Sequence, residues 1–215
     1  MQVYTKVPVE SCMRVTGKKP VGVRWIDVDK GKGDATKEKY RSRLVAQQYN
    51  DGFGEGLFAA TPPTEALQLM LSEAATGKDE AEVGIMVNDI SRAYFYADAT
   101  EPTYVKLCEE DMGEGEQGMC GRLNKAMYGT RTAAREWQKE FTKVLRELNF
   151  MNGKASPCIF YNAKKLLKTY VHGDDFVTCG PIGELQWLER ELKKRCNISA
   201  TIIGEGRILI RRYKC

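Results

Sequence analysis

Two adjacent carboxylates, Asp174 and Asp175, constrain the fold more than any other feature, because they stand between two short apolar runs. The runs at 165–171 and 176–179 have the composition of β-strands, so the segment predicts a hairpin with the acidic pair at its tip. Neighbouring carboxylates repel one another, and a divalent cation is the usual compensation. The alternative is an ordinary Gly-Asp-Asp turn, since both residue types favour turns.

A second acidic position lies upstream, where Asp89 ends the apolar stretch 82–89. This stretch also has the character of a strand. Carboxylates on two neighbouring strands can hold two metal ions about 3.5–4 Å apart, the arrangement that promotes in-line phosphoryl displacement. The sequence therefore makes Asp89, Asp174 and Asp175 the candidate metal ligands.

Composition places the chain in the globular class. Of its 215 residues, 42% are hydrophobic and 29% charged, enough for one domain or two small ones. The net charge of +4 is compatible with a phosphate-bearing partner. There is no apolar run of membrane-spanning length and no apolar signal-peptide core at the N-terminus. We therefore expect no membrane partner, no secretion and a reducing compartment, cytoplasmic or nuclear.

The cysteines and the single histidine exclude several common kinds of site. The seven cysteines are scattered without a C-x-x-C pair, and His172 is the only histidine. This pattern argues against a zinc site, a disulfide framework and a Cys-His or Ser-His catalytic pair. Any chemistry must then rest on carboxylate, Lys, Arg and Tyr side chains.

Hydrophobic periodicity predicts an α+β fold in which helices pack on one face of a largely antiparallel sheet. Residues 1–62 form the expected β-rich lobe, ahead of a larger region at 63–215. The predicted helices span 63–76, 133–150 and 184–195, and 29–35 and 109–118 are a turn and a loop. The predicted strands are 21–28, 39–49, 82–89, 103–108, 157–162, 165–171 and 176–179, with a strand-like tail at 201–213.

One predicted strand carries a row of cations. Lys39, Arg41 and Arg43 recur at a period of two, so their side chains share one face of the strand 39–49. A binding face for phosphate is one interpretation. A solvated edge strand is the other, because charges on an edge discourage aggregation.

Six blocks of residues, read in order over about 18–205, resemble the reverse transcriptase of copia-type long-terminal-repeat retrotransposons. One block alone is weak, but six in the family's order are specific. The blocks are Lys18–Trp25, like the opening strand; Tyr40–Ala46, like Tyr-Lys-Ala-Arg-Leu-Val-Ala; Phe58–Pro63, like Phe-Ala-Pro-Val; Asp89–Phe95, like the first catalytic motif; Leu123–Gly129 with Arg135 and Trp137, like Leu-Tyr-Gly-Leu-Lys-Gln-Ser-Pro-Arg-x-Trp; and the acidic pair, at the place of Tyr-Val-Asp-Asp.

The resemblance implies a fingers-and-palm fold and RNA-directed DNA synthesis on a primer, with deoxynucleoside triphosphates as substrates. Asp89, Asp174 and Asp175 would bind two Mg²⁺ ions, or Mn²⁺, as the catalytic carboxylates. The substrate-binding residues it implies are Arg41, Arg43 and the weaker candidate Lys39 for the triphosphate, Tyr94 beneath the sugar, and Thr132 at the place of a nucleotide-contacting glutamine. The other implied partners are an RNA or DNA template and the rest of a Pol polyprotein, in virus-like particles or free in the cytoplasm or nucleus.

The sequence also departs from the family pattern. His172-Gly173 replaces the usual Tyr-Val, and Ala134 replaces a proline. We expect His172 to be a turn residue near the primer end, and a core tyrosine is the alternative for Tyr94. We also expect the thumb, connection and ribonuclease H regions to be absent. An inactive remnant that at most binds nucleic acid is therefore the second hypothesis, and a nucleotide cyclase with paired aspartates is the third.

Overall fold

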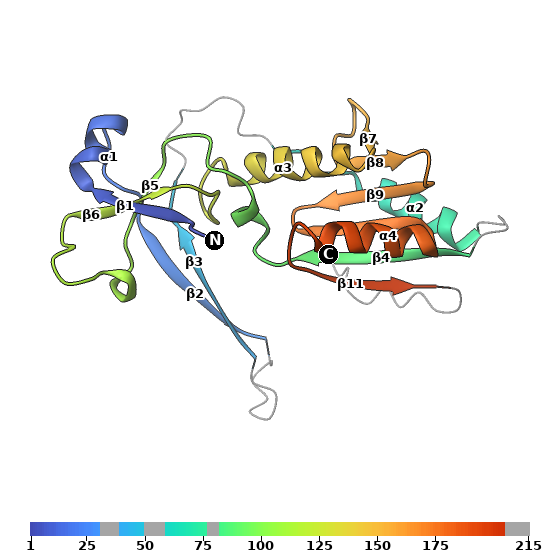
Figure 1. Ribbon diagram of the computed structural model, residues 1–215, viewed down its shortest axis with the longest axis horizontal. Helices are drawn as coiled ribbons and strands as arrows, with labels where there is room; N and C mark the ends of the chain where they lie inside the picture. The colour runs from blue at the N-terminus through green and yellow to red at the C-terminus, as the bar shows by residue number, and fades with distance from the viewer. Residues whose placement is uncertain (31–38, 50–58, 77–81, 205–215) are drawn as a thin grey trace. The chain divides into compact units, whose positions relative to one another are not determined.

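A computed structural model describes residues 1–30, 39–49, 59–76 and 82–204. The chain forms two compact units, each assembled from two segments (Figure 1). The first unit comprises Met1–Phe58 and Tyr94–Glu140, and the second comprises Ala59–Ala93 and Phe141–Cys215. Sequence analysis placed residues 94–140 with 63–215, whereas in the structure these residues return to the first unit. The reason is strand pairing, because this segment supplies two strands to the sheet that begins near the N-terminus.

The first unit contains two small antiparallel sheets. One has the order β1 (Tyr4–Pro8), β6 (Met119–Leu123) and β5 (Tyr104–Lys106), and the other is the hairpin of β2 (Val23–Asp29) and β3 (Tyr40–Ala46). The short helix α1 (Val9–Thr16) follows β1 and ends at Gly17, whose φ of 66° is easy only for glycine. Its Cys12 is buried against Tyr104 and Cys120.

A second cluster forms the main core of the first unit. Ala46, Val105, Leu123 and Met127 are buried together, and partly buried side chains from β2 and β3 pack on them. Two turns of 3₁₀-helix, η1 (Ala93–Tyr96) and η2 (Glu109–Asp111), lie in the connections around β5. Val23, Leu44 and Ala46 share one face of the β2–β3 hairpin, so this core fixes that face.

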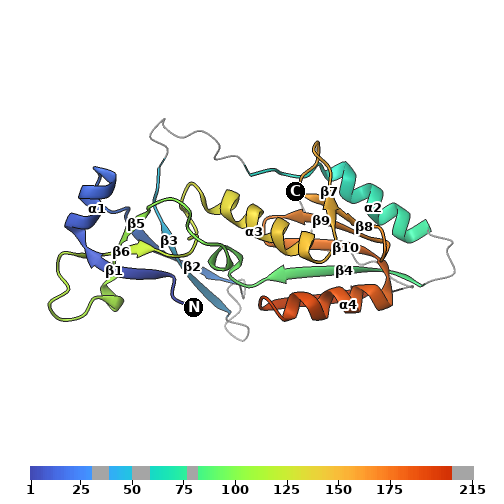
Figure 2. The same cartoon turned by 45° about the horizontal axis from the view of Figure 1, so that its top comes forward.

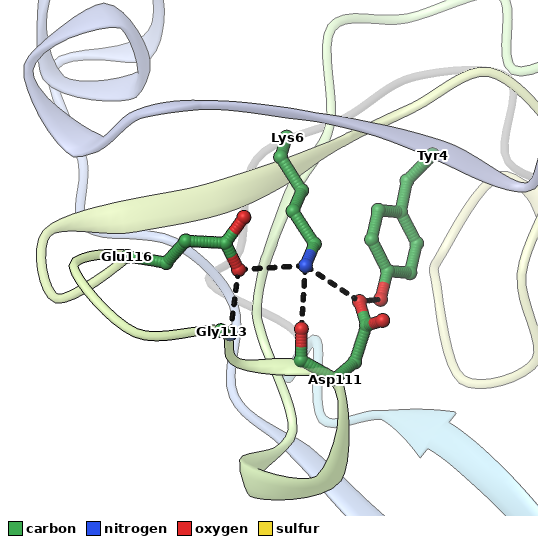
Figure 3. Close-up of polar contacts among 5 residues, drawn as sticks. All are labelled: Tyr4, Lys6, Asp111, Gly113 and Glu116. Atoms are coloured by element: carbon green, nitrogen blue, oxygen red, sulfur yellow. Dashed lines mark hydrogen bonds and ion pairs between the residues drawn. The ribbon is translucent and has the colours of Figure 1, made fainter.

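The acidic loop 109–118 is held to β1 by a charged cluster (Figure 3). The ammonium of Lys6 lies 2.7 Å from a carboxylate oxygen of Glu116 and 3.6 Å from one of Asp111. The hydroxyl of Tyr4 donates to Asp111. Burial, together with the Asp111 carboxylate, raises the pKa of the Tyr4 hydroxyl well above its usual range. The hydrogen bond from Lys6 lowers the pKa of Glu116 and raises that of Lys6, so this ion pair stays charged at neutral pH.

The second unit is built on one antiparallel sheet of six strands. Their order is β11 (Ile198–Ile203), β4 (Val83–Ile90), β10 (Asp175–Pro181), β9 (Leu167–His172), β8 (Ile159–Asn162) and β7 (Met151–Asn152). Three helices accompany it: α2 (Thr64–Thr76), α3 (Ala133–Glu147), which begins in the first unit, and α4 (Ile182–Lys193). The sheet thus places β4 between β10 and β11.

Helices cover both faces of this sheet, which corrects the expectation that they pack on one. Leu67 and Met70 of α2 are buried against Ile85 of β4. The neighbouring Gly84 points the other way, where an added Cβ would lie 3.3 Å from Leu185 of α4. Phe141 of α3 contacts Phe176 of β10, on the same side as Gly84. Because successive strand residues alternate between faces, α2 lies on one side and α3 and α4 on the other (Figure 2).

The fold class is thus α+β, a mixed structure with antiparallel sheets and four α-helices among the described residues. No described helix combines the length and apolar character needed to cross a membrane. The strand-like tail predicted at 201–213 is observed only to Ile203 in β11, and residues 205–215 lie outside the described part of the chain. The predicted turn 29–35 falls largely on 31–38, which lie outside it too.

Candidate active site

Asp89 and Asp175 occupy directly opposed positions on the adjacent strands β4 and β10. The backbone N–H of Ile90 donates to the carbonyl of Asp174 at 3.2 Å. In an antiparallel ladder this makes Asp89 and Asp175 a pair that exchanges no backbone hydrogen bonds, the kind whose side chains lie closer together. Both side chains are exposed and project from the same face of the sheet.

Asp174 lies in the two-residue turn that joins β9 to β10. His172 pairs with Asp175, so only Gly173 and Asp174 form the turn. Gly173 has a φ of 65°, and Asp174 is not among the positive-φ residues. This combination is that of a type II′ turn, which prefers glycine at its first central position. The glycine that departs from the family pattern is therefore the residue type that suits this turn best.

The opposed aspartates belong to a longer row across four strands. Ser199 of β11 pairs with Asp89, and His172 of β9 pairs with Asp175. Register partners share a face, so the row runs Ser199, Asp89, Asp175, His172 on one side of the sheet. Sequence reasoning placed His172 in a turn, whereas it is the last residue of β9. It missed Ser199, because nothing in the sequence reveals which strand borders β4.

The three aspartates offer the hard oxygen ligands that Mg²⁺ prefers. Their backbones are brought together by the β4–β10 register and the adjacent turn. Among the residues described, however, no group of three or more His, Cys, Asp and Glu side chains has the arrangement needed to hold a metal ion. Like charges directly opposite on neighbouring strands destabilise a sheet, so a cation between Asp89 and Asp175 would relieve a cost that the register imposes. The backbone positions of the three aspartates are therefore compatible with a divalent cation bound by their carboxylates.

Asn88 introduces a polar group beneath the acidic row. Its side chain is fully buried and faces away from Asp89, on the side of Phe176. Neither its amide nitrogen nor its amide oxygen has a hydrogen-bond partner in the described structure. A buried amide without partners costs free energy, and nothing in the structure explains this residue.

The candidate triphosphate-binding cations lie in the first unit. Arg41 and Arg43 alternate along β3, so both are on one face of the hairpin, and Lys39 immediately precedes the strand. Arg24 of β2 shares this face, because it pairs with Val45. Sequence reasoning missed Arg24, although the alternation of the strand 21–28 gave a signal for it. The guanidinium carbon of Arg43 lies 5.7 Å from the ring centre of Tyr128.

The other two candidate substrate-binding residues differ in exposure. Tyr94 is half-buried in η1, where its ring centre lies 4.5 Å from that of Tyr128. Thr132 is buried, with 6% of its surface exposed, just before α3, and its carbonyl accepts the N–H of Glu136 at 2.9 Å. The structure therefore gathers Arg43 and Tyr94 around Tyr128, a residue that sequence reasoning noted only as part of a motif.

Opposed carboxylates on an antiparallel sheet, beside an acidic hairpin turn, offer oxygen ligands of the kind that divalent cations prefer. Comparison with known families identifies the class of protein. The model of the family described as Reverse transcriptase (RNA-dependent DNA polymerase) matches residues 9–203, and the chain belongs to this family.

Curated relatives confirm the resemblance to copia-type elements. The chain is 26% identical over 148 residues to the Retrovirus-related Pol polyprotein from transposon TNT 1-94 of Nicotiana tabacum, covering 67% of the chain and 11% of that protein. It is 25% identical over 165 residues to the Pol polyprotein from transposon RE1 of Arabidopsis thaliana, covering 74% and 11%. It is also 25% identical over 172 residues to the Transposon Ty1-DR1 Gag-Pol polyprotein of Saccharomyces cerevisiae, covering 78% and 9%. The matched region is thus about a tenth of these relatives.

Proposed function

We propose that this chain is the fingers-and-palm region of an RNA-directed DNA polymerase from a copia-type retrotransposon. The observation that carries the proposal is the direct opposition of Asp89 and Asp175 across β4 and β10, with Asp174 in the adjoining turn. Family membership supports the same conclusion independently. In this assignment the second unit is the palm, and the β2–β3 hairpin of the first unit belongs to the fingers.

The three aspartates hold two Mg²⁺ ions, or Mn²⁺, in this proposal. The ions, when bound, activate the primer 3′-hydroxyl and neutralise charge on the leaving pyrophosphate. The role of the carboxylates is positional, because phosphoryl transfer needs little covalent help from protein. Asp89 and Asp175 contribute oxygens from two strands, and Asp174 contributes them from the turn. Replacement of any one removes a charge that the pair of cations requires.

Substrate binding is assigned to the first unit. The guanidinium groups of Arg41 and Arg43 bind the triphosphate through paired hydrogen bonds, with Lys39 as a weaker contact. Tyr94 packs beneath the sugar and excludes a 2′-hydroxyl, while Thr132 lies near the nucleotide. The partners are an RNA or DNA template with its primer, deoxynucleoside triphosphates and the remainder of a Pol polyprotein, the kind of protein that the relatives' names describe.

Primer extension on an RNA template tests this function. Wild-type protein with Mg²⁺ is expected to extend a labelled DNA primer, and Asp174→Asn is expected to abolish extension. Asp98→Asn is the matched control, since Asp98 is an exposed aspartate whose carboxylate binds Lys125. Extension that survives in Asp174→Asn would refute the assignment of the carboxylates.

A second candidate function is nucleic-acid binding without catalysis. The observations that favour it are that the described carboxylates do not converge as a three-ligand group and that Asn88 is buried without a partner. Binding would then depend on the basic face of the β2–β3 hairpin and weaken steeply with salt. Salt-sensitive binding of primer-template by a folded protein, without extension in Mg²⁺ or Mn²⁺, identifies this case.

A further inference from the structure

We propose that Tyr128 is a positioning residue that links the triphosphate-binding cation Arg43 to the sugar-contacting Tyr94. The inference rests on the proposed function and adds to it the residue that sets discrimination between deoxyribo- and ribonucleotides. All of the side chains concerned belong to the first unit. The argument begins with the backbone that holds Tyr128.

The loop that carries Tyr128 is fixed to the end of β3. The N–H of Ala46 donates to the carbonyl of Tyr128 at 2.7 Å, and the N–H of Gln48 donates to the carbonyl of Gly129 at 3.3 Å. The side-chain oxygen of Gln48 accepts the N–H of Arg131 at 2.9 Å. Three hydrogen bonds over four residues make this loop an extension of the β2–β3 hairpin. A shift of β3 therefore carries Tyr128 with it.

Gly129 allows this approach because it has no side chain. Its φ is 85°, and a Cβ built on it would lie 1.9 Å from the carbonyl oxygen of Ala46. The backbones of the loop and the strand are therefore closer than a residue with a side chain at position 129 would permit. This close contact limits how far Tyr128 can move relative to Arg43 on the same strand.

Three side chains of the described part of the chain pack against the ring of Tyr128. The guanidinium carbon of Arg43 is 5.7 Å from its centre, within the range of a cation–π contact. The Tyr94 ring lies against it at 4.5 Å with an interplanar angle of 52°. Phe95 meets it edge-on at 5.9 Å and is itself packed on the core of the first unit. The ring is thus a shared support for one residue that binds phosphate and one that contacts sugar.

This arrangement has a specific consequence for nucleotide selection. Tyr94 can exclude a 2′-hydroxyl only if its ring stays at a fixed distance from the sugar, and the position of the sugar depends on where Arg43 holds the triphosphate. Without the Tyr128 ring, the Tyr94 ring can move away from the sugar, and the Arg43 guanidinium loses the aromatic surface on which it stacks. The preference for deoxyribonucleotides over ribonucleotides should then fall together with the affinity for the triphosphate. A general loss of fold would instead lower the rates of deoxyribonucleotide and ribonucleotide insertion by the same factor.

Single-nucleotide insertion measures the discrimination. The ratio of kcat/KM for a deoxyribonucleotide to that for the matching ribonucleotide is compared in wild type, Tyr128→Leu and Tyr128→Phe. Tyr128→Leu is expected to lower the ratio by about tenfold. Tyr128→Phe keeps the aromatic ring and is expected to retain the wild-type ratio. Equal loss with both nucleotides, at an unchanged ratio, would overturn the proposal in favour of a structural role.

Nucleotide binding separates this inference from the proposed function. Calorimetric titration with dATP and Mg²⁺ requires no extension, and Tyr128→Leu is expected to weaken the Kd by about tenfold relative to both wild type and Tyr128→Phe. An unchanged Kd in Tyr128→Leu, or no binding by the wild type, would overturn the role of Tyr128. Loss of extension with dATP binding intact would instead count against the carboxylate assignment. Thermal unfolding of each variant verifies that the protein is folded.

Discussion

Asp89 and Asp175 face each other across β4 and β10 as the closer type of antiparallel pair, with their side chains on one face of the sheet. Two like charges in this position oppose the pairing of the strands that carry them. The sheet tolerates the pair because Met86 and Phe176 on the same strands are fully buried on the other face. The register is therefore set by the core, and the carboxylates follow from it.

The first prediction concerns this repulsion. Asp89→Asn is expected to raise the free energy of unfolding by about 0.2–1 kcal/mol in EDTA, because it removes a like charge opposite Asp175. Added Mg²⁺ should raise the melting temperature of the wild type and have little effect on the variant, since a ligand stabilises only the state that binds it. Thermal unfolding in EDTA and in Mg²⁺ measures both. A variant less stable than wild type in EDTA would contradict the repulsion.

The second prediction concerns the buried Asn88. Asn88→Leu is expected to stabilise the fold by about 1–3 kcal/mol, because it replaces an amide without partners by an apolar side chain of similar size. Thr178→Val is the comparison, since its buried hydroxyl lies 2.9 Å from that of Thr169. That change should destabilise the protein by leaving Thr169 without this bond. Urea unfolding of both variants tests the contrast, and a destabilised Asn88→Leu would indicate a partner for the amide.

The third prediction compares two glycines with left-handed backbones. Gly118 has a φ of 97° and open space around it, whereas Gly129 approaches Ala46 too closely for a side chain. Gly118→Ala should cost about 1–2 kcal/mol from backbone conformation alone. Gly129→Ala should cost clearly more, because the loop must also leave β3. Equal unfolding free energies for the two variants would show that the contact at Gly129 is unimportant.

The fourth prediction is a loss of stability at alkaline pH. Burial raises the pKa of the Cys179 thiol from 9.0 to about 12, and the residue is 5% exposed. A thiol that ionises more readily unfolded than folded stabilises the fold fully below pH 9 and loses this contribution as the pH rises from 9 to 12. At pH 10 the loss is about 1 kcal/mol.

Cys179→Val separates this effect from other titrations. The difference in unfolding free energy between wild type and variant should shift by that amount in favour of the variant when the pH is raised from 8 to 10. Urea unfolding at the two pH values measures the shift. A pH-independent difference would mean that the thiol ionises equally well in both states.

Strong periodicity made the larger elements predictable. The helix expected at 63–76 is observed as Thr64–Thr76, and the strand expected at 82–89 as Val83–Ile90. The helix expected at 133–150 ends at Glu147, because the chain turns at Asn149, whose φ is 63°. Left-handed backbone at an asparagine is a local event that hydrophobic periodicity does not encode.

Short elements and strand order were not predictable. The strand Tyr4–Pro8 and the helix Val9–Thr16 were missed, because each is too short for a clear period and is fixed by packing on Met119–Leu123. The position of β4 beside both β10 and β11 gave the candidate site its row of four side chains. Single-sequence patterns made Asp89, Asp174 and Asp175 the candidate ligands and placed His172 beside them, but they gave neither the register of these residues nor the neighbouring Ser199.

The two-segment make-up of each unit has a consequence for synthesis of the chain on the ribosome. Residues 59–93 leave the ribosome with β4 and its Asp89, but both described strands that pair with β4, β10 and β11, are encoded after residue 174. Until then neither edge of β4 has a neighbouring strand to accept its backbone hydrogen bonds. All segments of the first unit, in contrast, have been synthesised by residue 140. Vectorial folding would thus complete the first unit before β4 has any partner strand. A nascent chain stalled before residue 175 should need chaperone protection that the finished chain does not.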